Sequence, residues 1–187
     1  FGNKKNKIKE TSVENPQSFY GLAKSLSFEI SRTYREQFKL NICNLILFNH
    51  ESKLRPNYFI IKKIINEIKK LKSQNKVKKK LVLGNLNIQR DWGWAPEYIK
   101  LIYKIANSKF KEDFVIATGK SHKLSDVVKK IFDSNQLSIN KNIVISKKFI
   151  RSNEILANYA NIGKIKRYFK WKPKFTLKKI INELQKK

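Results

Sequence analysis

The stretch LNICNLILF, residues 40–48, is a nearly continuous apolar run. Ahead of it, the apolar residues between positions 18 and 39 recur at mostly helical spacing, so a helix is expected to lead into a buried strand. A strand that is apolar on both faces is typical of a parallel sheet covered by helices. The chain is therefore predicted to have an α/β fold.

The residues after this run continue an alternation of strands and helices. Residues 49–57 are polar and include Pro56, so a loop is expected at the carboxyl end of the strand, where open α/β sheets bind ligands. Ser121 or Ser125 is a candidate N-cap for one later helix, and Thr176 for the last. Periodicity and turn residues predict helices over residues 58–71, 95–106, 124–132, 162–169 and 176–184, and strands over residues 80–84, 88–92, 113–118 and 143–145.

Length and composition bound the kind of protein. A chain of 187 residues with 41% apolar residues can form a core, and no apolar run approaches the roughly 20 residues of a membrane-spanning helix. No signal segment opens the chain, so a soluble, cytoplasmic protein is expected. The single cysteine, Cys43, excludes an internal disulfide and is expected to be a buried, inert thiol in the strand. The chain has no methionine and begins at Phe1, which indicates a fragment of a longer protein.

The formal net charge of +28 makes a polyanion a candidate partner. A charge of this size attracts nucleic acid through its long-range field and through counterion release. Lysines are spread over all segments of the chain, which favours a general compositional trend over a dedicated binding stripe. A non-catalytic basic module that binds nucleic acid or another polyanion therefore remains the alternative hypothesis.

Several kinds of site are excluded by the residues that are missing. The two nearest glycines, Gly84 and Gly93, are too far apart for a Gly-x-Gly-x-x-Gly fingerprint, and no phosphate-binding loop is present. Two histidines and one cysteine exclude a zinc cluster, so no metal site is expected. No Gly-x-Ser-x-Gly elbow supports a hydrolase. This chain alone cannot form a complete nucleotide site.

Tyr20 and Lys24 are the candidate catalytic pair. They lie four residues apart at the start of the first predicted helix, which places the phenol and the ammonium on one face. A nearby cation favours the phenolate and lowers a tyrosine pKa, so Tyr20 could act as an acid or base near neutral pH.

The Tyr-x-x-x-Lys spacing is not specific by itself. It recurs at Tyr58 and Lys62 and at Tyr168 and Lys172, where a core aromatic residue beside a surface lysine is expected. Context singles out the first pair, because SFYGLAK, residues 18–24, resembles the Ser-Pro-Tyr-Gly-x-x-Lys signature of the extended short-chain dehydrogenases/reductases.

Further blocks narrow the resemblance to the GDP-mannose 4,6-dehydratase family. They follow one another in the family's order over nearly the whole chain, which makes the match highly specific. The blocks are NLILFNHES (44–52) followed by Arg55 and FIIKKI (59–64), LGNLNIQRDWGWAPEYI (83–99), EDFVIATGKSH (112–122), FIRSNEI (149–155) and FKWKP (169–173).

The resemblance implies catalytic and cofactor-binding roles for four residues. Tyr20 would remove the proton from the sugar 4-hydroxyl while hydride passes to NADP. Lys24 would hold the nicotinamide ribose and lower the pKa of Tyr20. His50 and Arg55 match residues that contact NADP, and a guanidinium suits a ligand that carries phosphate.

The resemblance also implies substrate-binding roles for Asn49, Arg90, Arg151 and Glu154. The arginines would bind the diphosphate of a GDP-sugar, and Glu154 a nucleotide hydroxyl or a base edge. The implied reaction converts GDP-mannose into GDP-4-dehydro-6-deoxy-mannose, a step of nucleotide-sugar metabolism.

The implied architecture is a partial NAD(P)-binding Rossmann-like sheet with a smaller mixed α/β substrate-binding lobe. Residues 1–50 and about 90–120 would be the remainder of the Rossmann-like domain, and about 51–89 and 121–187 the substrate lobe, in one intertwined unit. The amino-terminal Rossmann half, with the glutamate and threonine of the elimination step, would precede Phe1, and neither Glu10 nor Glu14 is expected to replace that glutamate. The isolated chain is therefore expected to be inactive, and the complete protein to form dimers or tetramers.

Overall fold

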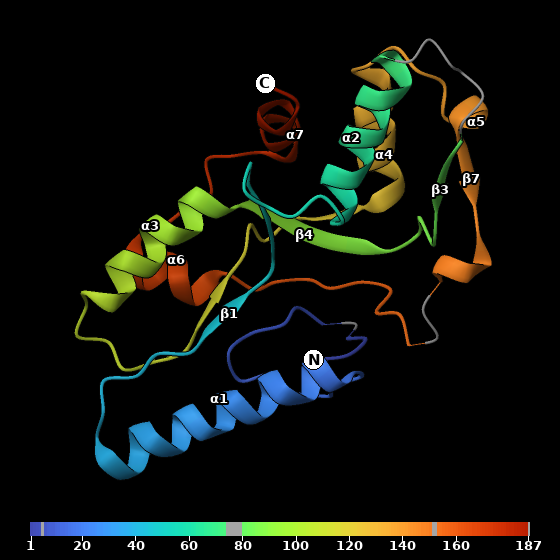
Figure 1. The fold of residues 1–187 in the computed structure, drawn as a ribbon. Helices are drawn as coiled ribbons and strands as arrows, with labels where there is room; N and C mark the ends of the chain where they lie inside the picture. The colour runs from blue at the N-terminus through green and yellow to red at the C-terminus, as the bar shows by residue number, and fades with distance from the viewer. Residues whose placement is uncertain (5, 74–79, 151–152, 187) are drawn as a thin grey trace.

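The computed structural model describes residues 1–4, 6–73, 80–150 and 153–186, and these residues form an α/β fold (Figure 1). The helices are α1 (Phe19–Phe38), α2 (Ile60–Ser73), α3 (Ala95–Ala106), α4 (Leu124–Asp133), α5 (Ile139–Asn142), the 3₁₀ helix η1 (Lys147–Phe149), α6 (Gly163–Phe169) and α7 (Leu177–Gln185). The strands are β1 (Leu45–Leu47), β2 (Asn49–Glu51), β3 (Leu81–Leu83), β4 (Gln89–Trp94), β5 (Phe114–Ile116), β6 (Ser121–Lys123) and β7 (Ile143–Ile145).

Three small sheets organise the described part of the chain. Strands β1 and β5 pair in parallel, as do β3 and β7. Strand β4 is the centre of the third sheet, parallel to β2 and antiparallel to β6. The parallel pairs confirm the predicted α/β class, and they bring the carboxyl ends of strands that are distant in sequence to common edges.

The core is divided into two clusters. The first gathers the buried side chains of α2, α4, α7 and β3, and the second gathers those of α3, α6 and β5 together with Ile8 and Phe48. In Figure 1, α2 and α4 lie together on one side of β4, while α3 and α6 lie near β1. The buried isoleucines of α2, at positions 61, 64, 65 and 68, confirm the predicted apolar face.

Local signals in the sequence predicted the starts of two helices correctly. Helix α3 spans the predicted residues 95–106, with Pro96 in its first turn, where a missing N–H costs nothing. Thr176 caps α7, because its side chain accepts a hydrogen bond from Lys179 N. The predicted cap of α4 is wrong: Ser121 lies in β6, Ser125 lies inside the helix, and Lys123 is the N-cap residue without a side-chain bond.

The prediction for residues 40–48 is only partly correct. Strand β1 is confirmed but short, and Leu47 is 40% exposed, because one face of the strand opens toward α1 across a cavity. Cys43 precedes the strand and is half-buried, donating to Phe110 O. The expected loop after the run begins with strand β2, since residues 49–51 pair with β4. Tyr58 is 75% exposed, so the expectation of a core aromatic there is wrong.

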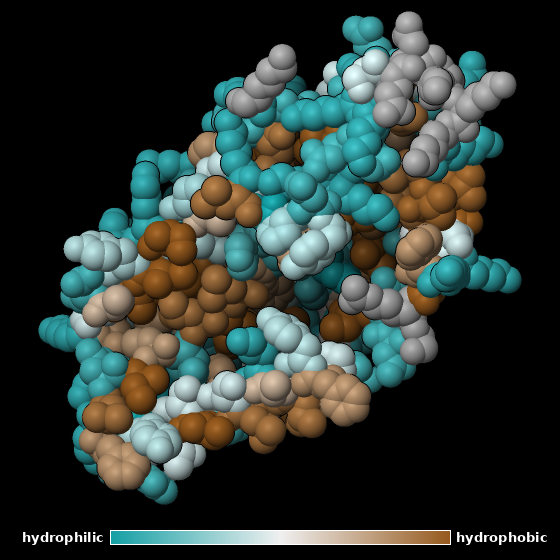
Figure 2. Space-filling view, in the orientation of Figure 1, coloured by the Kyte–Doolittle hydropathy of each residue, from teal (hydrophilic) through white to brown (hydrophobic). Residues whose placement is uncertain are grey.

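Helix α1 is held by polar contacts. None of its 20 residues, all of which the structure describes, is buried, and Figure 2 shows an apolar band along its outer side. Near its carboxyl end, Arg35 binds Asp113 through two hydrogen bonds, Nη1 to Oδ1 at 2.7 Å and Nη2 to Oδ2 at 3.1 Å. Arg35 also donates to Ile42 O, and Asn44 Nδ2 donates to Phe28 O.

The Arg35–Asp113 pair is largely shielded from water. The two side chains are 14% and 11% exposed. Burial acts to raise the pKa of Asp113, but hydrogen bonds from Arg35 and from Asn44 N outweigh it and hold that pKa below its usual range. The attachment of α1 to the sheet is therefore an ionic one, present at neutral pH.

Replacing Arg35 by alanine is expected to lower the free energy of unfolding by about 3 kcal/mol, because Asp113 would be left without its charged partner. Arg32→Ala is the matched control: Arg32 pairs with Glu29 in an exposed contact on the same helix, and its loss should cost less than about 0.5 kcal/mol. Urea denaturation followed by circular dichroism measures both. Equal effects of the two substitutions would show that the Asp113 pair does not anchor α1.

Candidate active site

A cavity of about 980 Å³ lies between α1 and strand β1. Its walls come from the first residues of the chain, the first half of α1, the segment 44–47 and the segment 153–155, with His50 and Arg90 contributing from β2 and β4. Figure 2 shows the surface hollowed above the apolar band of α1. A volume of this size suits a bound organic ligand of the size of a nucleotide.

Tyr20 and Lys24 both line this cavity from the amino-terminal turns of α1. Ser18 caps the helix, its Oγ accepting a hydrogen bond from Gly21 N at 3.1 Å, which fixes where the first turn begins. Lys24 Nζ lies 5.8 Å from the centre of the Tyr20 ring, so phenol and ammonium share one face of the helix. The side chain of Tyr20 is exposed, so its hydroxyl can reach a ligand in the cavity.

His50 lines the cavity from β2 in a defined tautomer. Its Nδ1 lies 2.9 Å from Phe48 O, and because a carbonyl oxygen only accepts, Nδ1 must carry the proton. In the neutral ring, Nε2 is then a hydrogen-bond acceptor. The ring packs at 5.8 Å from the ring of Tyr98, which is buried.

Arg90 and Glu154 complete the polar wall. Arg90 belongs to β4, and its Nη1 donates to Gln89 O at 2.8 Å. Glu154 is half-buried, and its Oε2 is a fully buried atom without a hydrogen-bond partner among the described residues. A buried acceptor without a donor is costly in free energy.

Two of the predicted site residues lie elsewhere, and a third falls outside the described residues. Asn49 is on β2 opposite Trp92 and is not among the cavity residues. Arg55 is also outside the cavity; its Nε lies 3.5 Å from Glu51 Oε2, and its guanidinium lies 3.8 Å from the centre of the Phe59 ring. Arg151 falls outside the described residues. Their roles remain predictions.

Two acidic residues near the site were not expected from the sequence. Glu14 lines the cavity and accepts a hydrogen bond from Ser25 Oγ, and Ser25 directly follows Lys24 of the predicted catalytic pair. Asp91, next to Arg90, is fully buried and accepts hydrogen bonds from Thr118 N, Thr118 Oγ1 and Gly119 N. Asp91 therefore ties β4 to the turn after β5. In the sequence, the only indication of a role for Asp91 was its place, followed by Trp92, in the family block 83–99.

A match to a family model supplies the identification. The model described as GDP-mannose 4,6 dehydratase matches residues 1–184 of the chain. The chain belongs to the GDP-mannose 4,6-dehydratase family. This confirms the resemblance drawn from the motifs between Ser18 and Pro173.

Relatives within the family are similar at about the same level. GDP-mannose 4,6 dehydratase 1 of Arabidopsis thaliana is 31% identical over 181 residues, which are 97% of this chain and 50% of the relative. The human GDP-mannose 4,6 dehydratase is 31% identical over 94% of this chain and 51% of its own. The chain thus spans about half the length of these family members.

Solved structures share the fold at low sequence identity. A dTDP-glucose 4,6-dehydratase of Bacillus anthracis in complex with NAD superposes with a TM-score of 0.86 at 20% identity, over 98% of this chain and 57% of that one. The protein RMD of Pseudomonas aeruginosa, complexed with NADPH, gives 0.83 at 15% identity, over 96% and 58%. The chain therefore shares its α/β fold with these two structures over somewhat more than half of their length.

Two further findings concern the described residues. They contain no group of three or more histidine, cysteine, aspartate or glutamate side chains arranged to hold a metal ion. None of the helices they form is long and apolar enough to cross a membrane.

Glu51 is expected to make stability depend on pH. Burial raises its pKa from 4.5 to about 7, against the opposing effect of Arg55 and Lys62. Because the folded-state pKa is the higher one, the stabilising contribution is complete below pH 4.5 and is lost as pH rises through about 7. The loss is about 3 kcal/mol, from 1.36 kcal/mol per pKa unit.

The measurement is urea denaturation at pH 5 and pH 8. The Glu51→Gln variant is expected to lack most of the pH-dependent loss, whereas Glu67→Gln, on the exposed face of α2, should retain it. A Glu51→Gln variant with the same pH dependence as the unmodified chain would contradict the assignment.

Proposed function

We propose that this chain forms the catalytic and substrate-binding half of a GDP-mannose 4,6-dehydratase that acts with NADP. The observation that carries the proposal is the convergence of Tyr20, Lys24, Arg90 and Glu154 on one cavity. The product would be GDP-4-dehydro-6-deoxy-mannose. The second hypothesis, a nucleic-acid module, predicts a lysine-lined groove away from Tyr20, and the convergence favours the dehydratase.

The side chains in the cavity fit a sugar nucleotide. Arg90 and Lys24 supply positive charge for phosphate groups, and a guanidinium can bind two phosphate oxygens at once. Glu154 lines the same cavity, and its carboxylate would accept from a ribose hydroxyl or a base N–H group. His50, which is predicted to contact NADP, adds an acceptor on β2 through the lone pair of Nε2.

In this proposal Tyr20 and Lys24 act together on the sugar and the cofactor. Tyr20 accepts the proton of the sugar 4-hydroxyl, and Lys24, on the same helical face, favours the phenolate and binds the nicotinamide ribose. The hydride acceptor would be supplied by NADP, which Lys24 would hold at the nicotinamide ribose. Abstraction of the C5 proton and loss of water from C6 fall to residues of an amino-terminal half.

The helices and strands can also be assigned to the two predicted lobes. We propose that α1, β1, α3 and β5 belong to the Rossmann-like part, and that α2, β3, β7, α4 and α7 form the substrate lobe. Within the described residues β1 pairs with β5 alone, so its other edge offers unpaired N–H and C=O groups. A complete Rossmann-like sheet would continue at this edge.

The test is to supply the amino-terminal half of the Arabidopsis relative, fused to this chain or in trans, and to follow the conversion of GDP-mannose by NMR in the presence of NADP. Conversion is expected, and Tyr20→Phe is expected to lower the rate by at least about a hundredfold, because the proton acceptor is removed.

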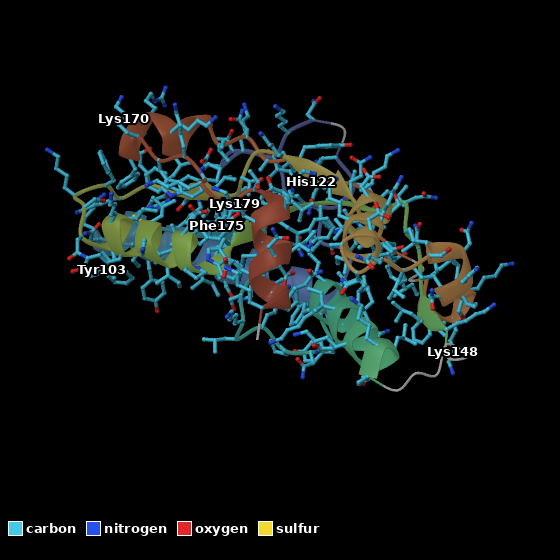
Figure 3. All side chains as sticks on the ribbon, turned by 90° about the horizontal axis from the view of Figure 1, so that it is seen from above. Tyr103, His122, Lys148, Lys170, Phe175 and Lys179 are labelled. Atoms are coloured by element: carbon cyan, nitrogen blue, oxygen red, sulfur yellow. The ribbon has the colours of Figure 1, made fainter. Side chains whose placement is uncertain are left out.

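Tyr103→Phe is the matched control. Tyr103 is 71% exposed on α3 and lies at the periphery of the molecule (Figure 3), outside the cavity. Its loss of a hydroxyl should leave the rate unchanged. Full activity of the Tyr20→Phe protein would reject the role of Tyr20, and a folded complex without any conversion would reject the proposed function.

A further inference from the structure

The turn that follows β2 is fastened to α2. Arg55 N donates to Ser52 O at 3.2 Å and Leu54 N donates to Ser52 Oγ, which closes the turn. Lys62, in the first turn of α2, donates from Nζ to Arg55 O at 2.8 Å and to Lys53 O at 2.5 Å. The backbone that carries Arg55 is thus fixed at both ends, by β2 and by α2.

The side chain of Arg55 is held as firmly as its backbone. Its guanidinium lies 3.8 Å from the centre of the Phe59 ring, and its Nε lies 3.5 Å from Glu51 Oε2. The side chain of Glu51 is 1% exposed and that of Arg55 is 13% exposed. Phe59 and Glu51 therefore fix the plane and the direction of the guanidinium from two sides.

The contact leaves hydrogen-bonding capacity unused. Glu51 Oε2 and Arg55 Nε are both fully buried and without a hydrogen-bond partner among the described residues. The two Nη groups of Arg55 are not among the fully buried unpaired atoms, and no described residue accepts a hydrogen bond from them. The end of the guanidinium is therefore available to an anionic ligand, while its Nε edge faces Glu51.

The charges around Glu51 come from two directions. Arg55 acts on it from the turn and Lys62 from α2, and β4 faces it with Trp94, which is uncharged. An apolar residue at position 51 would avoid the cost of burying a carboxylate. A buried ion pair is by itself weak evidence for stability, and a buried ionisable group with a shifted pKa beside a cation is a candidate for a functional role.

We propose that Glu51 is a positioning residue, whose buried carboxylate orients Arg55 on Phe59 so that its Nη groups bind a phosphate of NADP. This inference rests on the proposed function. Glu51 itself does not touch the ligand.

The affinity for NADP is expected to depend on pH. The pKa of Glu51, raised to about 7 by burial, means that the carboxylate forms between pH 6 and pH 8. If the carboxylate orients Arg55, NADP binds more tightly as pH rises through this range. If it only neutralises the positive charge, NADP binds more weakly as pH rises. The sign of the dependence therefore separates orientation from charge.

The experiment measures the dissociation constant of NADP by isothermal titration calorimetry, with the complemented protein, at pH 6, 7 and 8. Glu51→Leu is expected to weaken NADP binding about tenfold at pH 8, which lies within the range of coupling energies between residues in contact. The pH dependence that this variant retains comes from NADP and from the other titrating groups of the protein. Subtracting it from that of the unmodified protein isolates the contribution of Glu51.

A double-substitution cycle tests whether Glu51 acts through Arg55. In the Arg55→Ala background, Glu51→Leu should cause no further loss, because the residue to be oriented is gone. Glu67→Gln is the control and should bind NADP like the unmodified protein, since Glu67 pairs with Lys70 on α2, away from the turn.

Three outcomes would overturn the proposal: affinity that falls with pH in the unmodified protein after the subtraction, an unchanged dissociation constant in Glu51→Leu, or an equal loss with and without Arg55. Complemented protein that is folded but does not bind NADP at all would instead overturn the proposed function, and with it the phosphate assigned to Arg55.

Discussion

The bidentate ion pair between Arg35 and Asp113 is the contact on which the site depends. Helix α1 carries Tyr20 and Lys24 but buries no residue, so hydrophobic packing does not set its position. Tyr20 is 15 positions before Arg35, which is about 22 Å along a helix. The predicted catalytic pair therefore lies near the end of α1 that is far from this ion pair. Two further contacts hold α1 nearer the cavity. Asn44 Nδ2 donates to Phe28 O, and Ser25 Oγ donates to Glu14.

Three buried carboxylates show how differently this basic chain treats acidic groups. Asp113 has a guanidinium and a backbone N–H, and its pKa is lowered. Asp91 has three donors from the turn after β5, although burial still raises its pKa. Glu51 has a cation at 3.5 Å and an oxygen without a hydrogen bond, and its pKa is raised. The first two are structural ties, whereas burial disfavours the ionised form of Glu51.

The sequence predicted helices better than strands, for a physical reason. Helix boundaries depend on local signals, such as Pro96 at the start of α3 and Thr176 at the cap of α7. Burial of a strand depends on what packs against both faces, which is why the run 40–48 forms a strand of which Leu47 is exposed. Strand β6, SHK, has no apolar pattern, and only its pairing with β4 defines it.

The site was predictable to the extent that it follows from strand ends and one helical turn. Four-residue spacing brings Tyr20 and Lys24 together, and parallel pairing of β2 with β4 brings His50 near the strand that carries Arg90. Spacing carries no information on Glu154, which reaches the cavity through a segment more than a hundred residues later and is recognised there by its unpartnered oxygen. Lys24 and Arg90 bring positive charge to a cavity that Glu14 and Glu154 also line, so the side chains around it carry charges of both signs. A groove lined by cations alone would suit a plain polyanion, and the two carboxylates set this cavity apart from such a groove.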